Sequence, residues 1–253
     1  MADRDEIISF CNDLLEIGKF DDYGPNGLQV PGRQEVRKVV TGVSAHRALI
    51  EQAISDGADL LIAHHGLFWD FHPRALTTQM ADRLRAALVA HLSVASYHLP
   101  LDAHPEIGNN ALLRDALDLD PAPGSFGLAK GRPIGVVGRS EEGVAAAEMA
   151  SRLAALTGRE ALVQGAGPKT IRSVGIVTGA GASMIHEAVA LGLDALITGE
   201  AAEHAMADAE EGGIHFFAAG HYATETLGVR RLGDLIAERF GVEHEFVDIA
   251  NPV

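Results

Sequence analysis

The chain has 253 residues, of which 47% are hydrophobic and 22% are charged, a composition that excludes a disordered, collagen-like or disulfide-stapled protein. Its 35 acidic side chains outnumber 20 basic ones, so the net charge is -15 at pH 7. Such a charge repels polyanions and therefore disfavours binding to nucleic acid or to an anionic membrane surface. The single cysteine, Cys11, cannot form an internal disulfide, which favours a cytoplasmic location.

The sequence also argues against export and membrane insertion. Residues 1–6 are mostly charged and lack the basic and then apolar pattern of a signal peptide. No stretch is both long enough and apolar enough to span a bilayer. We therefore expect a soluble protein without membrane contact.

Apolar runs alternate with helical patterns along almost the whole chain, which is typical of an α/β fold. The predicted helices span residues 6–17, 45–55, 79–90, 143–156, 183–191 and 224–239. The predicted strands span residues 36–43, 60–63, 93–97, 134–137, 174–178, 195–198, 214–218 and 243–249. Pro and Gly in residues 120–131 favour this stretch as the crossover between two parts of the chain.

An internal repeat supports a two-lobe architecture. Residues 37–66 align without gaps on residues 172–201, and both contain the ordered block Gly-x-Asp-x-Leu-Ile. The block reads as a helix stop followed by a buried strand. In this alignment His64 and His65 fall opposite Gly199 and Glu200, so each lobe ends a strand in polar residues.

Residues of types that can bind metals follow four of the predicted strands. They are His64 and His65, then His98, Asp102 and His104, then Glu200, and finally His221 and Glu225. Open α/β sheets place ligands at the carboxyl ends of their strands. His221 and Glu225 are four residues apart, so a helix beginning there presents both from one face.

Each segment alone has a simpler structural explanation. His64 and His65 suit a surface turn, Asp102 suits a Pro-rich turn that accepts backbone N–H groups, and Glu200 suits a helix cap. His221 and Glu225 could equally form an exposed surface pair. The conjunction favours metal, because five such groups exceed the usual three protein ligands of a mononuclear zinc site and suit two divalent ions.

Several motifs in chain order closely resemble the GTP cyclohydrolase I type 2 homologues, the NIF-three-like family of dinuclear metal-centre proteins. The resemblance covers the chain from end to end. It rests on Asn-Gly-Leu-Gln-Val at 26–30, Ala-His-His-Gly at 63–66 with Phe68 and Trp69, His-Leu-Pro-Leu-Asp-Ala-His at 98–104 with Gly-Asn-Asn at 108–110, Thr-Gly-Glu at 198–200 and His-Tyr-Ala-Thr-Glu at 221–225.

The resemblance implies two interlinked three-layer α/β lobes with the metal site between them at the strand C-terminal ends. Lobe one is expected to comprise residues 1–126 and 220–253, and lobe two residues 127–219. The family assembles as a toroidal homohexamer, which is therefore expected here. The distance from Asp102 to His221 leaves no room for the large inserted domain of some members.

The resemblance also implies a ligand set for two divalent ions, with Zn, Mn or Fe as candidates. His65 and Asp102 would bind one ion, His64 and His221 the other, and Glu225 would bridge both. His98, His104, Tyr222 and Glu200 match family positions near the site. Of these, His98, His104 and Glu200 are the candidate catalytic residues, because they could carry protons during turnover.

Two functions remain open on the sequence. One is metal-dependent hydrolysis of a small substrate, by the family name an opening of the imidazole ring of GTP, through water activated between two cations. The other is a metal-handling or regulatory scaffold without turnover. Ligands bind metal in both cases, so the sequence does not separate them.

A glycine-containing segment at residues 178–183, between a strand and a helix, is a separate candidate for phosphate binding. Met184 stands where the dinucleotide-binding fingerprint requires its last glycine, so that fingerprint is broken. An ordinary strand-to-helix turn is the favoured interpretation.

Overall fold

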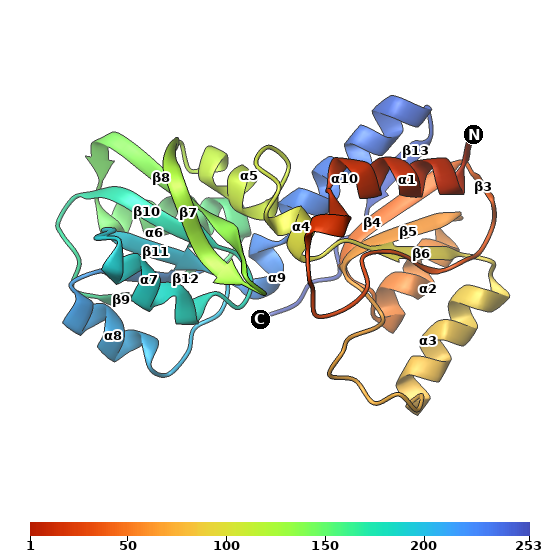
Figure 1. Cartoon of the computed structure of the whole chain (residues 1–253), viewed down its shortest axis with the longest axis horizontal. Helices are drawn as coiled ribbons and strands as arrows, with labels where there is room; N and C mark the ends of the chain where they lie inside the picture. Colours follow the sequence, from red (N-terminus) through yellow and green to blue (C-terminus); the bar gives the residue numbers. More distant parts are fainter. The chain divides into compact units, whose positions relative to one another are not determined.

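The computed structural model describes residues 1–253, which group into two compact units. Unit 1 comprises Met1–Leu101 and Gly228–Ala250, and unit 2 comprises Asp102–Leu227 and Asn251–Val253. Each unit is a β-sheet with helices on both faces, so the predicted three-layer α/β fold class is confirmed (Figure 1). None of the helices combines the length and the apolar character that a membrane crossing requires.

Unit 1 is built on a five-stranded sheet with the order β13-β4-β5-β6-β2, in which only β2 is antiparallel to its neighbour. The strands of this sheet are β2 (Gly27–Val30), β4 (Lys38–Ser44), β5 (Leu60–His65), β6 (Ser93–Ser96) and β13 (Glu243–Phe246). Strands β1 (Ala2–Asp3) and β3 (Glu35–Val36) form a separate two-stranded sheet. Its helices are α1 (Arg4–Leu14), η1 (Ile17–Lys19), α2 (Arg47–Ser55), α3 (Thr78–Val89), and parts of α4 (Leu99–Asp102) and α10 (Thr226–Phe240).

The core of unit 1 forms where the apolar faces of its helices meet the sheet. Helices α2 and α3 cover one face, and α1 and α10 cover the other (Figure 1). Leu49 and Ile50 of α2 pack in one cluster with Val40, Leu61 and Val94 of the sheet. The parallel strands are apolar along their length because both of their faces are covered.

Unit 2 is built on a six-stranded sheet with the order β7-β8-β10-β11-β12-β9, whose parallel centre is β10-β11-β12. Its strands are β7 (Asp120–Ala129), β8 (Arg132–Val144), β9 (Leu162–Gly165), β10 (Ile171–Val177), β11 (Ala195–Thr198) and β12 (His215–Ala218). Its helices are α5 (Asn109–Ala116), α6 (Ala146–Thr157), η2 (Ala182–Met184), α7 (Ile185–Ala190), α8 (Ala205–Gly212) and α9 (His221–Thr224).

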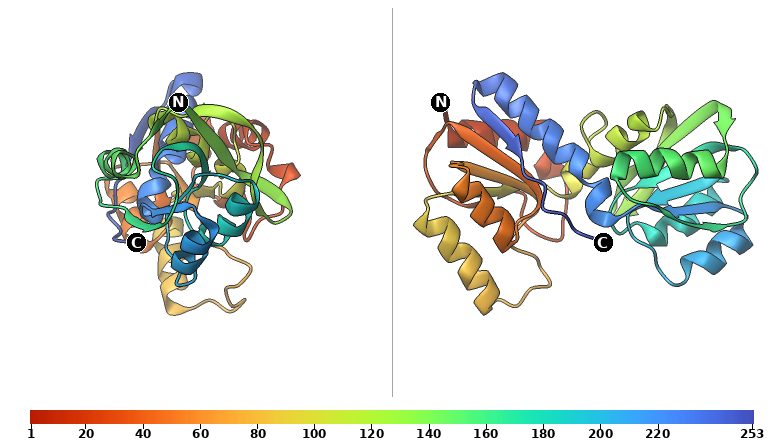
Figure 2. Two further views of the ribbon diagram at one scale, coloured as in Figure 1. Left: turned by 90° about the vertical axis from the view of Figure 1, so that its left-hand side faces the viewer. Right: turned by 180° about the vertical axis from the view of Figure 1, so that it is seen from behind.

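The core of unit 2 lies under α5 and α6, which share one face of its sheet. Seen from behind, α6 crosses the strands of the sheet (Figure 2). Leu113 of α5 and Leu153 of α6 pack with Val174, Ile197 and Phe217 of the central strands. The opposite face is covered by α7 and α8 (Figure 1).

The sequence repeat corresponds to a repeated hydrogen-bond arrangement. The Asp59 carboxylate accepts bonds from the backbone N–H groups of Arg37 (2.8 Å) and Lys38 (3.3 Å). The Asp194 carboxylate accepts the equivalent bonds in unit 2 from Arg172 (2.8 Å) and Ser173 (2.9 Å). Each aspartate thus ties the start of one parallel strand to the next, which explains why the repeat retains it.

Residues 120–131 are not the predicted crossover. They form β7 and its turn into β8, because the Phe126 ring is buried in a space that only glycine leaves open. A Cβ at Gly175 would lie 2.5 Å from that ring, and one at Gly135 would lie 3.0 Å from it. The chain instead passes from unit 1 to unit 2 within α4, at Leu101 and Asp102.

The boundaries of the two compact units differ from those of the predicted lobes, which lie at residues 126/127 and 219/220. Strand β7 pairs with β8, and α5 packs against β8, so both belong to unit 2. At the other end, α9 lies in unit 2 and most of α10 in unit 1.

Replacing Leu61 with alanine should destabilise the protein strongly. Leu61 is fully buried in the core of unit 1, so its truncation leaves a cavity that costs about 2–5 kcal/mol. Leu88→Ala, on the exposed side of α3, is the matched control and should change the unfolding free energy by less than about 0.5 kcal/mol. Urea unfolding followed by circular dichroism measures both, and equal effects would contradict the core assignment.

Candidate metal centre

Three imidazoles gather at the carboxyl ends of β5 and β6 in unit 1. His64 and His65 end β5, and His98 follows β6 after one intervening residue, Tyr97. Ring centroids are 4.8 Å apart for His64 and His65, 5.1 Å for His64 and His98, and 5.6 Å for His65 and His98. One nitrogen from each ring lies within 4.8 Å of the other two. We call these three residues the histidine cluster.

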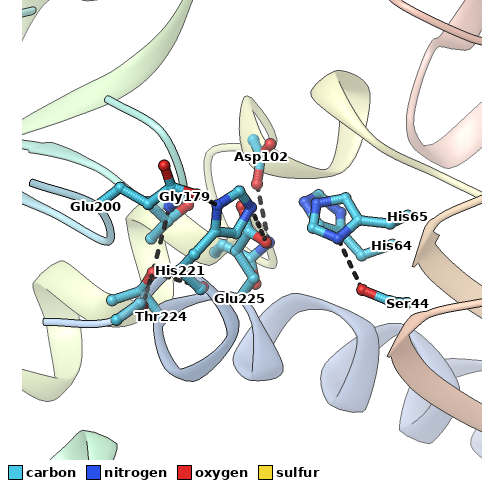
Figure 3. A network of polar contacts seen from close by, with 12 residues as sticks. Ser44, His64, His65, Asp102, Gly179, Glu200, His221, Thr224 and Glu225 are labelled. Atoms are coloured by element: carbon cyan, nitrogen blue, oxygen red, sulfur yellow. Dashed lines mark hydrogen bonds and ion pairs between the residues drawn. The ribbon is translucent and has the colours of Figure 1, made fainter. Parts of the chain in front are cut away.

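A hydrogen bond at Nδ1 orients each ring of the histidine cluster. His64 Nδ1 donates to the carbonyl oxygen of Tyr97 at 2.9 Å, which fixes its tautomer. His65 Nδ1 lies 3.0 Å from Ser44 Oγ (Figure 3). His98 Nδ1 lies 2.7 Å from a carboxylate oxygen of Asp22. Metal-binding histidines usually have such a partner on the second nitrogen, so Nε2 is the atom that this arrangement assigns to a metal.

Asp22 is held as a carboxylate by its surroundings. Burial alone raises its pKa, but the hydrogen bond and charge of His98 overcome this effect and lower the pKa below its usual value. Its second oxygen accepts bonds from Asn26 Nδ2 and the Leu99 backbone N–H, each at 2.9 Å. The ionised Asp22 therefore fixes both the ring of His98 and the start of the segment that follows it.

A cluster of acids around one imidazole forms in unit 2. His221 begins α9 and Glu225 follows its last residue, so one turn brings His221 Nε2 within 3.1 Å of the Glu225 carboxylate. His221 Nδ1 lies 2.5 Å from Glu200, which follows β11 (Figure 3). Carboxylate oxygens of Asp102 and Glu225 lie within 4.8 Å of one another. We call Asp102, Glu200, His221 and Glu225 the acidic cluster.

Asp102 and Glu225 are both buried, with 5% and 3% of their surface exposed. Two close carboxylates in a medium of low polarity repel each other and require positive charge nearby. Asp102 also accepts a hydrogen bond from Asn109 Nδ2 at 2.8 Å, which holds its orientation. The acidic cluster is therefore arranged to receive cations.

His221 supplies that positive charge in the metal-free protein. Burial opposes the charged imidazole, but the hydrogen bond and charge of Glu225, followed by those of Glu200, raise the pKa of His221 to about 9. Its proton occupies the direction in which Nε2 would otherwise bind a metal ion. Metal binding at this nitrogen must therefore displace a proton.

The absence of a side chain at Gly179 leaves the space that the Glu225 carboxylate occupies. A Cβ at Gly179 would lie 2.2 Å from Glu225 Oε1, and the φ of Gly179 is +66°. The Gly179 backbone N–H donates to Thr224 Oγ1, which in turn bonds the carbonyl oxygen of Gly220 (Figure 3). A carboxylate against this turn would repel a phosphate, in agreement with the interpretation of residues 178–183 as an ordinary turn.

The structure distributes the predicted site residues over the two clusters. Of the predicted metal ligands, the histidine cluster holds His64 and His65, and the acidic cluster holds the other three. Of the predicted catalytic residues, His98 belongs to the histidine cluster and Glu200 bonds His221. The Nδ1 atom of His104 accepts the backbone N–H groups of Glu106 and Ile107, each at 3.2 Å, and its predicted catalytic role stays a prediction.

Sequence reasoning did not find the residues that orient the ligands. Asp22 is 76 residues from His98, and no spacing relates the two. Ser44 ends β4 beside His65 of β5, and only the register of the parallel pair brings them together. Asn109 is within a motif used for the resemblance, but that motif does not reveal its bond to Asp102.

Cys11 takes no part in either cluster. Burial raises the pKa of its thiol to about 12, so it stays protonated at neutral pH. A protonated thiol is not a metal ligand. The donors are therefore imidazoles and carboxylates, a set that suits Zn, Mn or Fe.

Comparison with known proteins places these residues in a family context. The family model described as Duf34/NIF3 (NGG1p interacting factor 3) matches residues 2–252. Proteins named GTP cyclohydrolase 1 type 2 homolog are 41% identical over 249 residues in Haemophilus influenzae and 40% identical over 248 residues in Escherichia coli strain K12. In both cases the match covers 98% of each chain.

Solved structures give the same result. A protein described as ybgI, of unknown function, has a TM-score of 0.94 and 39% sequence identity, with all of both chains covered. The protein TTHA1606 from Thermus thermophilus has a TM-score of 0.86 and 32% identity, again over all of both chains.

Substituting alanine at Gly179 should cost more stability than the same change at Gly192. Both glycines have nearly the same positive φ, but a Cβ at Gly192 meets nothing within 4 Å. Gly192→Ala should lose about 1–2 kcal/mol from backbone strain alone. Gly179→Ala should lose about 1–3 kcal/mol more, because Glu225 must move. Urea unfolding measures both, and equal losses would refute the close contact.

Replacing Glu200 with glutamine should lower the pKa of His221 in the metal-free protein from about 9 toward its usual 6.5. The raised pKa stabilises the folded state below about pH 6.5, and this stabilisation disappears as pH rises through 9. The variant should therefore lose stability mainly at low pH.

An NMR titration of the His221 ring in chelator-treated protein measures this pKa. Glu203→Gln, an exposed acid on the same loop, is the control and should leave it at about 9. An unchanged value in Glu200→Gln would show that the short contact does not govern the titration.

Proposed function

The chain belongs to the Duf34/NIF3 family, and we propose that it is a dinuclear-metal-binding protein that hydrolyses a small substrate. The observation that carries this proposal is the preset orientation of its donors. All three rings of the histidine cluster have their Nδ1 atoms engaged. Such arrangements are typical of metal sites, whereas ordinary surface histidines have no need of them.

In this proposal the two clusters act as halves of one centre. His65 and Asp102 would hold one divalent ion, and His64 and His221 would hold the other. Glu225 would be shared between the two ions. The separation of at most 4.8 Å between Asp102 and Glu225 oxygens supports Glu225 as the bridge, as does the contact between Glu225 and His221.

The chemistry that a pair of bridged cations supplies is activation of water near neutral pH and polarisation of a substrate oxygen. The protein's own residues orient the donors and handle protons. Glu200 holds the ring of His221 by its Nδ1 atom. His98, whose Nδ1 pairs with Asp22, is proposed as a proton carrier rather than as a metal ligand, and His104 and Glu200 are the other proposed proton carriers.

The proposed substrate class is a purine nucleotide. The relatives named above carry the name GTP cyclohydrolase 1 type 2 homolog, and the corresponding reaction would open the imidazole ring of GTP. We further propose a cytoplasmic location and a toroidal homohexamer, which the motif resemblance supports. Light scattering tests the assembly, and a monomer would contradict it.

A second candidate function is metal handling without turnover. The observation that favours it is the small space beside His98 in unit 1, where the cavity that His98 lines has a volume of about 10 Å³. This space admits about one water molecule, so a nucleotide does not fit on the side of His98 that faces it. A storage or transfer site would need no more room than that.

Replacing Glu225 with glutamine should release bound metal, because the change removes the bridging charge. Metal content of protein purified without added metal, measured by plasma mass spectrometry, should fall well below that of the wild type. Glu210→Gln, an exposed acid on α8, is the control and should retain the wild-type content. Equal metal content in all three proteins would contradict the proposed bridge.

Turnover separates the two candidate functions. Metal-loaded wild type is incubated with GTP and with simple phosphoesters, and the products are followed by chromatography. Hydrolysis that is lost in Glu225→Gln and kept in Glu210→Gln supports the hydrolase. Stable metal binding without hydrolysis of any of these substrates supports metal handling.

A further inference from the structure

Unit 1 contains a cavity of about 550 Å³ beside the histidine cluster. The loop that follows β5 and the first turns of α3 form its walls. Its volume lies within the usual range for sites that bind small molecules. The residues that line it are Phe68, Trp69, Asp70, His72, Pro73, Arg74, Ala75, Leu76, Thr77, Gln79, Met80 and Arg83.

The ring of Trp69 forms one part of this cavity, and the ring of Phe71, which does not line the cavity, lies against Trp69. Trp69 lines it, and its indole N–H donates to the carbonyl oxygen of Gly66 at 3.1 Å, which fixes the ring. Phe71 stacks on Trp69 with centroids 5.6 Å apart and an interplanar angle of 20°. Phe71 is 71% exposed although it is a large apolar side chain. The Trp69 ring, with Phe71 stacked on it, is a flat surface on which a planar ligand can stack.

Positive charge forms another part. Arg74 and Arg83 both line the cavity, and neither guanidinium is in an ion pair with a carboxylate of the chain. Asp70 is the one acid in the lining. In a chain with a net charge of -15, two uncompensated arginines at one cavity indicate an anionic ligand.

One residue of the lining, Trp69, lies beside the candidate metal ligands of unit 1. The Trp69 ring lies 5.1 Å from the ring of His98 and 5.9 Å from that of His65, measured between centroids. A ligand stacked on Trp69 would therefore contact a ring that is itself next to the histidine cluster.

We propose that this cavity is a binding site for a nucleoside monophosphate or a similar planar anion, with the base on Trp69 and the phosphate on Arg74 and Arg83. Stacking needs a planar ring system, and the two guanidinium groups of the lining need an anion, so neither a free nucleoside nor free phosphate satisfies both. The identification of this ligand with the substrate of the metal centre rests on the proposed function; binding itself does not.

The chain provides its own probe, because Trp69 is its only tryptophan. GMP added to the full-length protein should quench the tryptophan fluorescence with a saturable curve. Guanosine should bind at least about tenfold more weakly, because it lacks the charge that the arginines recognise. Orthophosphate alone should cause no comparable quenching, because it does not stack.

Variants locate the binding site. Arg74→Gln combined with Arg83→Gln should weaken GMP binding at least about tenfold. Phe71→Ala should weaken the binding of both GMP and guanosine. Arg85→Gln is the matched control, since Arg85 lies on the same helix but pairs with Asp82 and does not line the cavity. Phe71 and Arg74 are exposed and Arg83 is half-buried without an ion pair, so these changes should leave the fold intact, which circular dichroism checks.

Three results would overturn the proposal: no saturable quenching by GMP, equal affinity for GMP and guanosine, or GMP binding that the Arg74/Arg83 double variant leaves unchanged. The titration is repeated with chelator-treated wild type and with Glu225→Gln. If GMP binds to protein without metal, the proposed GMP site is supported even where the proposal of a metal centre is rejected. Metal binding and turnover without any response of Trp69 to GMP would reject this site alone.

Discussion

Two buried carboxylates in unit 2, Asp102 and Glu225, have oxygens within 4.8 Å of one another. Like charges at this separation in a poorly solvated place repel, and the fold must supply positive charge to hold both. In the metal-free protein the imidazolium of His221 does so, and its raised pKa reflects that role. Divalent cations would meet the same requirement more fully, and this requirement connects the acidic cluster to the proposed function.

Hydrogen bonds within the folded chain orient the other candidate donor side chains before any ligand binds. Tyr97, Ser44 and Asp22 each engage one ring of the histidine cluster, and Asn109 holds Asp102. These side chains therefore lose their conformational entropy when the chain folds, and little further entropy is lost when a ligand binds. The repeated fold explains where the histidines and Glu200 of the two clusters lie, because in both units they stand at or within three residues of the carboxyl ends of parallel strands: β5 and β6 in unit 1, β11 and β12 in unit 2.

Much of the fold could be predicted from the sequence, because the central strands are short apolar runs and the repeat marks their order. Asp59 and Asp194 illustrate how the repeat reports the fold, because each accepts the equivalent backbone N–H hydrogen bond in its own unit. Strand β7 could not be predicted, because its Pro and Gly content is typical of a loop and Phe126 gains its place only against glycines of neighbouring strands. The candidate ligands follow from their positions after strands, whereas partners such as Asp22 depend on tertiary contacts that no local pattern records.

Anomalous scattering at metal absorption edges, from crystals of protein purified without added metal, would show directly whether these side chains hold two ions. Two peaks per chain are expected, one at His65 and Asp102 and the other at His64 and His221, with Glu225 between them. Crystals without any peak at these side chains, or with His64 and His65 far from Asp102 and Glu225, would contradict this expectation.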